Sequence, residues 1–151
     1  MAETLGSLCD KLTIIKLKQW HSEDEIRLNS LAIQEKQLQN EINEFLNAVI
    51  SGKIPREKLT FASNKVYKEE SNFVPDVAGS IGEVFSQLAE VNCKLWHEQE
   101  KVYDFEKVTF KEKNIVVKQL AVLNLERNKC IDEIDKILLG IVNGNVIRFR
   151  E

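Results

Sequence analysis

The sequence predicts an all-α protein, an antiparallel four-helix bundle made of two repeated helical hairpins of which the second has longer arms. The chain of 151 residues is 43% hydrophobic and 30% charged, with six glycines and two prolines, a composition typical of packed helices. Apolar residues recur every three or four positions, as they do along the buried face of a helix. The length suits one domain that buries a core without disulfides.

An internal repeat organises the chain. Seven residues near the start recur, identical or similar, 76 positions later: Thr4, Leu5, Gly6, Leu12, Lys18, Trp20 and His21 correspond to Ser80, Ile81, Gly82, Leu88, Lys94, Trp96 and His97. A second set recurs 92 positions later: Leu31, Leu38, Ile42, Leu46 and Gly52 correspond to Leu123, Cys130, Ile134, Leu138 and Gly144. We therefore divide the single domain, residues 1–151, into repeat one (4–52), a connection (53–79), repeat two (80–144) and a short tail (145–151).

The change of offset from 76 to 92 places 16 additional residues in the second copy, between Tyr103 and Leu123. If they divide equally between two antiparallel arms, each arm gains eight residues, or about 12 Å at the helical rise of about 1.5 Å per residue. The second hairpin should therefore project beyond the first.

Local signals mark where the helices begin and end. Thr4 and Ser80 are good N-cap residues, and Ser80 has Glu83 three positions later, as in a capping box. Gly52 and Gly144 stand where a left-handed glycine commonly follows a helix. These signals predict helices that begin and end at matching places in the two copies.

Helical phase places the turn of the first hairpin. The stripe of Leu31 and Leu38 lies about 130° from the stripe of Leu8 and Leu12, a mismatch that a turn near Asn29–Ser30 removes. We expect that turn to join the two helices of repeat one.

The second turn and the connection are placed less narrowly. Thr109 with Glu112 resembles a capping box, whereas equal division of the additional residues puts the tip nearer Lys111–Asn114, so we expect the turn between Lys107 and Asn114. The connection holds both prolines, and we expect one short helix around Leu59–Glu70.

Two sets of charged residues bear on the core. Glu35 and Arg127 occupy equivalent places on their core stripes, so the internal dyad would bring them together as a partly buried pair. The alternative leaves both side chains at the edge of the stripe, reaching water.

The acidic residues Glu23–Glu25, Glu133 and Asp135 resemble in part the acidic helices of all-α nucleotide pyrophosphohydrolases, whose carboxylates hold magnesium. The full acidic pattern of those enzymes is missing, and we interpret these residues as charged helix faces.

The two tryptophans and the two histidines form a repeated Trp-His-x-x-acid motif. A histidine and a carboxylate three positions later share one helical face, the spacing of metal ligands in helical bundles and of a base oriented by an acid. The candidate ligands of a divalent metal, or candidate acid–base groups, are His21, Asp24, His97 and Glu100. Catalytic residues are not assigned.

The predicted direction of these histidines favours a different role. Each lies about 180° from its core stripe, so a metal site would need both back faces to converge. We expect solvated or interface-lining histidines, no cofactor, and tryptophans that pack at the bundle edge. Asp10, Ile14 and Leu17 share the first back face with His21. Its apolar residues predict that this face is covered by a second copy of the chain or another protein.

Several classes of function are disfavoured. The net charge of −3 lacks the positive field typical of nucleic-acid binding, and no phosphate-binding loop is present. The three cysteines show no paired spacing and are interpreted as reduced thiols. The chain has neither a basic-then-apolar leader nor an apolar run of membrane-spanning length, so we expect a cytoplasmic protein.

Parts of both halves resemble the uncharacterised bacterial helical family catalogued as domain of unknown function 4254. The resemblance is carried by residues 5–18, the Trp-His pairs, residues 65–68 and residues 124–135, with the two halves in reversed order. It implies an all-helical bacterial protein, sometimes encoded near glycan or lipopolysaccharide glycosyltransferases, and no established activity.

We therefore expect a helical interaction or scaffold protein that is not an enzyme, forms a homodimer or binds another protein, and acts through the first back faces or the projecting second hairpin. The alternative is a metal-dependent helical-bundle enzyme that uses the repeated motif.

Overall fold

The computed structural model describes residues 3–61 and 74–144, and these residues form helices and connections without strands. Four α-helices follow one another: α1 (Leu5–Trp20), α2 (Glu25–Ile50), α3 (Ile81–Tyr103) and α4 (Phe110–Val142). Two short 3-10 helices, η1 (Arg56–Lys58) and η2 (Phe105–Lys107), lie in the connections. The prediction of an all-α protein with four helices is confirmed.

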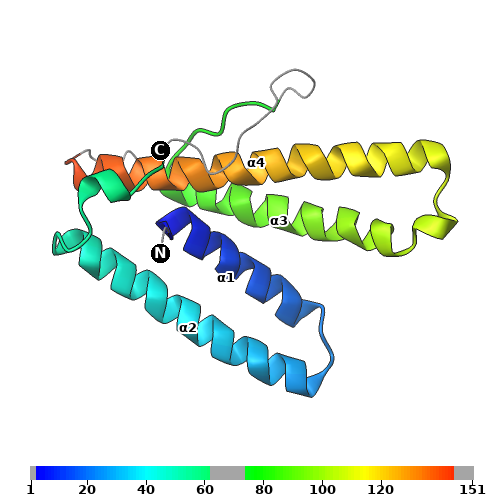
Figure 1. Ribbon diagram of the computed structural model, residues 1–151, viewed down its shortest axis with the longest axis horizontal. Helices are drawn as coiled ribbons and strands as arrows, with labels where there is room; N and C mark the ends of the chain where they lie inside the picture. The colour runs from blue at the N-terminus through cyan, green and yellow to red at the C-terminus, as the bar shows by residue number, and fades with distance from the viewer. Residues whose placement is uncertain (1–2, 62–73, 145–151) are drawn as a thin grey trace.

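Helix α1 occupies the centre of the arrangement. It packs against α2 on one side and against both α3 and α4 on the other, while α2 packs chiefly against α1. Figure 1 shows α3 and α4 lying along one another and the pair α1 and α2 inclined to them. Within the described residues, no helix combines the length and apolar character that crossing a bilayer requires.

The hydrophobic core lies where α1, α3 and α4 meet. Leu88 and Ile134 are fully buried there, and Ile42, Phe45 and Leu46 of α2 pack against it from outside. Burying a side chain of this size contributes roughly 1.5–3 kcal/mol. The buried members are Leu5, Cys9, Val77, Val84, Leu88, Cys130, Ile131, Ile134 and Leu138.

The predicted helix ends are largely confirmed. Thr4, Ser80 and Thr109 each accept a hydrogen bond from the third residue of the helix that follows, and each forms a capping box. Gly52 and Gly144 adopt left-handed backbone angles just beyond the C-cap residues of α2 and α4.

The prediction of the first turn was wrong. Asn29 and Ser30 lie inside α2, and the chain turns at residues 21–24, where the Asp24 carboxylate accepts a hydrogen bond from the Arg27 backbone N–H. The phase argument assumed that α1 buries one stripe, whereas α1 is covered on two sides. A phase measured from one of two buried faces misplaces the turn.

The second turn lies at residues 104–109, which overlaps the predicted range only at its beginning. The capping-box alternative at Thr109 is confirmed, and the alternative tip at Lys111–Asn114 is wrong because these residues lie inside α4. In the connection, Leu59 is buried directly after η1. Most of the short helix predicted around Leu59–Glu70 falls on residues outside those the structure describes.

Candidate functional site

The two Trp-His motifs meet at one end of the helix assembly. His21 follows the last residue of α1, and its ring stacks on the Trp96 ring of α3 with a centroid distance of 4.8 Å and an interplanar angle of 11°. The Trp96 indole N–H donates to Glu100 Oε1 at 3.0 Å, so this proton is used within α3. The structure thus joins His21 and Glu100 through Trp96.

The other two predicted ligands have different surroundings. Asp24 is the N-cap of α2, and its carboxylate is engaged with a backbone N–H at 3.1 Å. His97 is exposed on α3. Among the residues that the structure describes, no three His, Cys, Asp or Glu side chains form a group arranged to hold a metal ion.

A pocket of about 370 Å³ adjoins the ring stack. His21 and Trp96 share the lining of this pocket with two cationic side chains, Lys18 and Arg27, and no carboxylate of the described residues lines it. Its complete lining is Lys18, His21, Ser22, Arg27, Leu31, Gln34 and Trp96. The electrostatic character of this pocket is opposite to the net negative charge of the chain.

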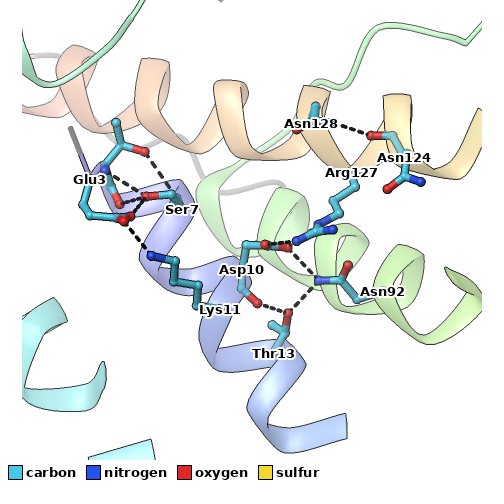
Figure 2. A network of polar contacts seen from close by, with 10 residues as sticks. Glu3, Ser7, Asp10, Lys11, Thr13, Asn92, Asn124, Arg127 and Asn128 are labelled. Carbon is cyan, nitrogen blue, oxygen red and sulfur yellow. Dashed lines mark hydrogen bonds and ion pairs between the residues drawn. The ribbon is translucent and has the colours of Figure 1, made fainter. Parts of the chain in front are cut away.

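A buried polar network ties α1 to α3 and α4 (Figure 2). The Asp10 carboxylate, 4% exposed, accepts from Arg127 Nε at 2.8 Å, from a second guanidinium nitrogen and from Asn92 Nδ2 at 2.9 Å. Asn92 also donates to Thr13 Oγ1 at 2.7 Å. The hydrogen bond with Asp10 raises the pKa of Arg127. Because Asn92 and Arg127 come from α3 and α4, the network fixes α1 against both of these helices.

This network corrects two predictions. Arg127 pairs with Asp10, and Glu35 instead accepts from Lys16 Nζ at 3.0 Å and Gln19 Nε2 at 2.8 Å. The predicted pair of Glu35 and Arg127 was therefore wrong. The face of α1 that carries Asp10 was expected to point outward, but it turns toward α3 and α4, where a buried carboxylate requires a cationic partner.

Sequence reasoning also missed Asn92, which is 1% exposed. The signal was present, because Asn92 lies four positions after Leu88 and continues the core stripe of α3. A polar residue on a core stripe indicates a buried hydrogen-bond partner.

Asp135 forms a second buried contact between α1 and α4. Its carboxylate, 2% exposed, accepts from the Gly6 backbone N–H at 2.8 Å and bonds to the Thr4 side chain. Burial raises the pKa of Asp135 to about 6. The interpretation of Asp135 as part of a charged helix face was wrong, because its side chain is buried. A Cβ atom at Gly6 would overlap the Ile131 carbonyl oxygen, so the two backbones approach closely.

Exposed large apolar side chains gather near both turns. Trp20 is 85% exposed beside the first turn, and Tyr103 and Phe110 are each 81% exposed on either side of the second. Ile115 and Val117 add exposed apolar surface to the first turns of α4. We call the second turn, with its exposed side chains of Tyr103, Phe110, Ile115 and Val117, the apolar tip.

No protein family, curated protein or solved structure matches this chain.

Proposed function

We propose that the protein is a helical interaction protein, that its two helix pairs are copies of one antiparallel hairpin, and that it forms a homodimer through the apolar tip. The observation that carries the function is the exposure of Tyr103 and Phe110, 81% each, on both sides of one turn. Aromatic side chains are enriched where proteins associate, and isolating them from water is favourable.

The ends of the helices support the repeat. Helices α1 and α3 begin at Leu5 and Ile81, 76 positions apart, and α2 and α4 end at Ile50 and Val142, 92 positions apart. Helix α3 has 23 residues against 16 in α1, and α4 has 33 against 26 in α2. Each arm is thus seven residues longer in the second pair, about two helical turns, which preserves the phase of its buried stripe.

The greater length of the second pair supports a role for its tip. Figure 1 shows the turn between α3 and α4 lying beyond the end of α1. A partner can approach this turn without displacing α1 or α2. The apolar tip therefore combines accessibility with side chains that gain from being covered.

The charges around the tip favour a second copy of the chain as the partner. Residues 104–113 carry three acidic and three basic side chains: Asp104, Glu106, Glu112, Lys107, Lys111 and Lys113. In a twofold dimer, residue i of one copy contacts residue j of the other and residue j contacts residue i, so a surface of mixed signs offers basic partners for its own acidic side chains. A strongly single-signed tip would repel itself.

Sedimentation equilibrium tests this proposal over a concentration range of about 1–200 µM. We expect the natural chain to shift from monomer to dimer and the double variant Tyr103→Ser with Phe110→Ser to remain monomeric. Trp20→Ser is the matched control, since it removes an equally exposed aromatic residue from the other turn. A natural chain that stays monomeric, or a double variant that associates as the natural chain does, would contradict the proposal.

The broader biological setting rests on resemblance. Similarity to the family catalogued as domain of unknown function 4254 supports a bacterial origin and a link to glycan or lipopolysaccharide synthesis. Elemental analysis of the purified protein separates this interaction role from the metal-dependent alternative, because the alternative requires stoichiometric bound metal.

A further inference from the structure

We infer that the pocket beside the His21–Trp96 stack binds a small organic phosphate that carries both a phosphate group and a planar ring. The pocket is formed by the end of α1, the beginning of α2 and Trp96 of α3, and its volume of about 370 Å³ is within the range of small-ligand sites. None of its residues belongs to the apolar tip, so this inference stands independently of dimerisation.

The polar lining of the pocket is suited to an anion. Lys18 and Arg27 make no ion pair with any other residue that the structure describes, although both line the same pocket. Arg27 offers a planar set of N–H donors, and Lys18 offers a compact positive charge. A phosphate monoester, with several acceptor oxygens, satisfies more of these donors than a single carboxylate does.

Ser22 supplies an additional, unsatisfied donor. Its hydroxyl oxygen is buried and has no hydrogen-bond partner among the described residues, while the residue lines the pocket. A buried hydroxyl without a partner is costly, and a phosphate oxygen in the pocket would remove that cost. Gln34 also lines the pocket, and its amide N–H donates to Ser30 Oγ at 3.3 Å.

The apolar and aromatic lining of the pocket is suited to a flat group. Leu31 is 4% exposed and forms an apolar lining, and Trp96 is held by two contacts, the ring stack with His21 and the hydrogen bond to Glu100. An indole oriented in this way offers a rigid surface for offset stacking with a ligand ring. The ligand therefore needs both an anionic group and a planar ring.

Tryptophan fluorescence tests this inference with adenosine 5′-monophosphate as the probe. The chain has two tryptophans, and Trp20→Phe, a change at a side chain that is 85% exposed, leaves Trp96 as the single tryptophan. We expect saturable quenching by the nucleotide, with a midpoint at least about tenfold lower than that of adenosine or inorganic phosphate alone. Adenosine tests stacking without the phosphate, and inorganic phosphate tests charge without the ring. The two controls therefore separate recognition of the whole nucleotide from either contribution by itself.

Variants in the same background assign the binding to the pocket. Lys18→Gln and Arg27→Gln should each raise the midpoint about tenfold or more, because each removes a charged hydrogen-bond donor. Lys36→Gln is the matched control, an exposed α2 lysine outside the pocket, and should leave the midpoint unchanged. Circular dichroism verifies that each variant keeps its helices.

Unchanged emission up to about 5 mM nucleotide would overturn the inference. So would equal midpoints for nucleotide and adenosine, or a folded Arg27→Gln variant that binds as tightly as its background. Loss of binding in both pocket variants but not in Lys36→Gln would establish the site.

Discussion

Helices α1 and α3, the first helices of the two pairs, each bury one similar apolar face. Their second faces differ, because that of α1 is buried and that of α3 is exposed to solvent. Gly6 and Gly82 are 76 positions apart, yet Gly6 is buried against the Ile131 carbonyl whereas a Cβ at Gly82 would meet no atom within 4 Å. Asp10 is buried and its counterpart Ser86 is exposed. The difference arises because α1 is covered on two sides, and it teaches that periodicity identifies one buried face but not a second.

The second helices differ in the same way. Glu35 and Arg127 are 92 positions apart, and Glu35 is held by surface side chains of α1 whereas Arg127 enters a buried pair with Asp10. Asn43 and Asp135 are likewise 92 positions apart, and only Asp135 is buried. Arg127 and Asp135, the two residues of α4 that differ here from their counterparts in α2, are thus residues that contact α1.

The largest expected effect comes from adding one methyl group at each of the two related glycines. Gly6→Ala should lower the free energy of unfolding by about 4 kcal/mol, because it forces α1 away from α4 and weakens the bond from the Gly6 N–H to Asp135. Gly82→Ala, in open space, should raise it by up to about 1 kcal/mol through helix propensity. Urea denaturation measures both.

The comparison would fail if the two alanine variants changed stability alike. Equal losses of stability would mean that the close contact of Gly6 with the Ile131 carbonyl does not make its substitution costlier than that of Gly82. Two neutral results would mean that α1 does not pack closely on α4 at Gly6.

The next effect distinguishes the two related charges. Arg127→Gln should cost about 3 kcal/mol, because it leaves the Asp10 carboxylate buried without a cation. Glu35→Gln should cost less than about 1 kcal/mol, since its ion pair with Lys16 lies at the surface. Thermal and urea unfolding of both variants at pH 7 provide the measurement, and a cost at Glu35 equal to that at Arg127 would refute the distinction.

The smallest of the three effects depends on pH. The folded pKa of Asp135, about 6, lies above its ordinary value of 3.8, so the folded state holds this proton more tightly than the unfolded chain. Its contribution to stability is fully present below about pH 4 and is lost as the pH rises through 6. Between pH 4 and pH 7.5 the loss should be about 2 kcal/mol, because each tenfold difference in proton affinity between the folded and unfolded states corresponds to about 1.4 kcal/mol.

Asp135→Asn, which introduces the residue found at the related position 43, isolates this contribution. The stability difference between the natural chain and the variant should shift with pH in favour of the variant between pH 4 and 7.5. A difference that stays constant with pH would show that Asp135 titrates as it does in the unfolded chain.

Sequence reasoning succeeded where the interactions are local. The capping boxes at Ser80 and Thr109 join residues three apart, and the left-handed glycines follow directly from the residues beside them. It failed at the turn near Asn29, because that placement depended on which faces of α1 are covered. It also missed the Trp96 stack with His21, since the two motifs lie on different helices.

The sequence by itself determined an all-α chain with four helices and most of their ends, because hydrogen bonding and side-chain periodicity act within about four residues. Only the tertiary structure decided that α1 lies between α2 and the other two helices. That position removes Asp10 and Asp135 from water, so their partners had to come from residues distant in the sequence. The free energy of desolvating a charge depends on what covers it, and no local pattern records that.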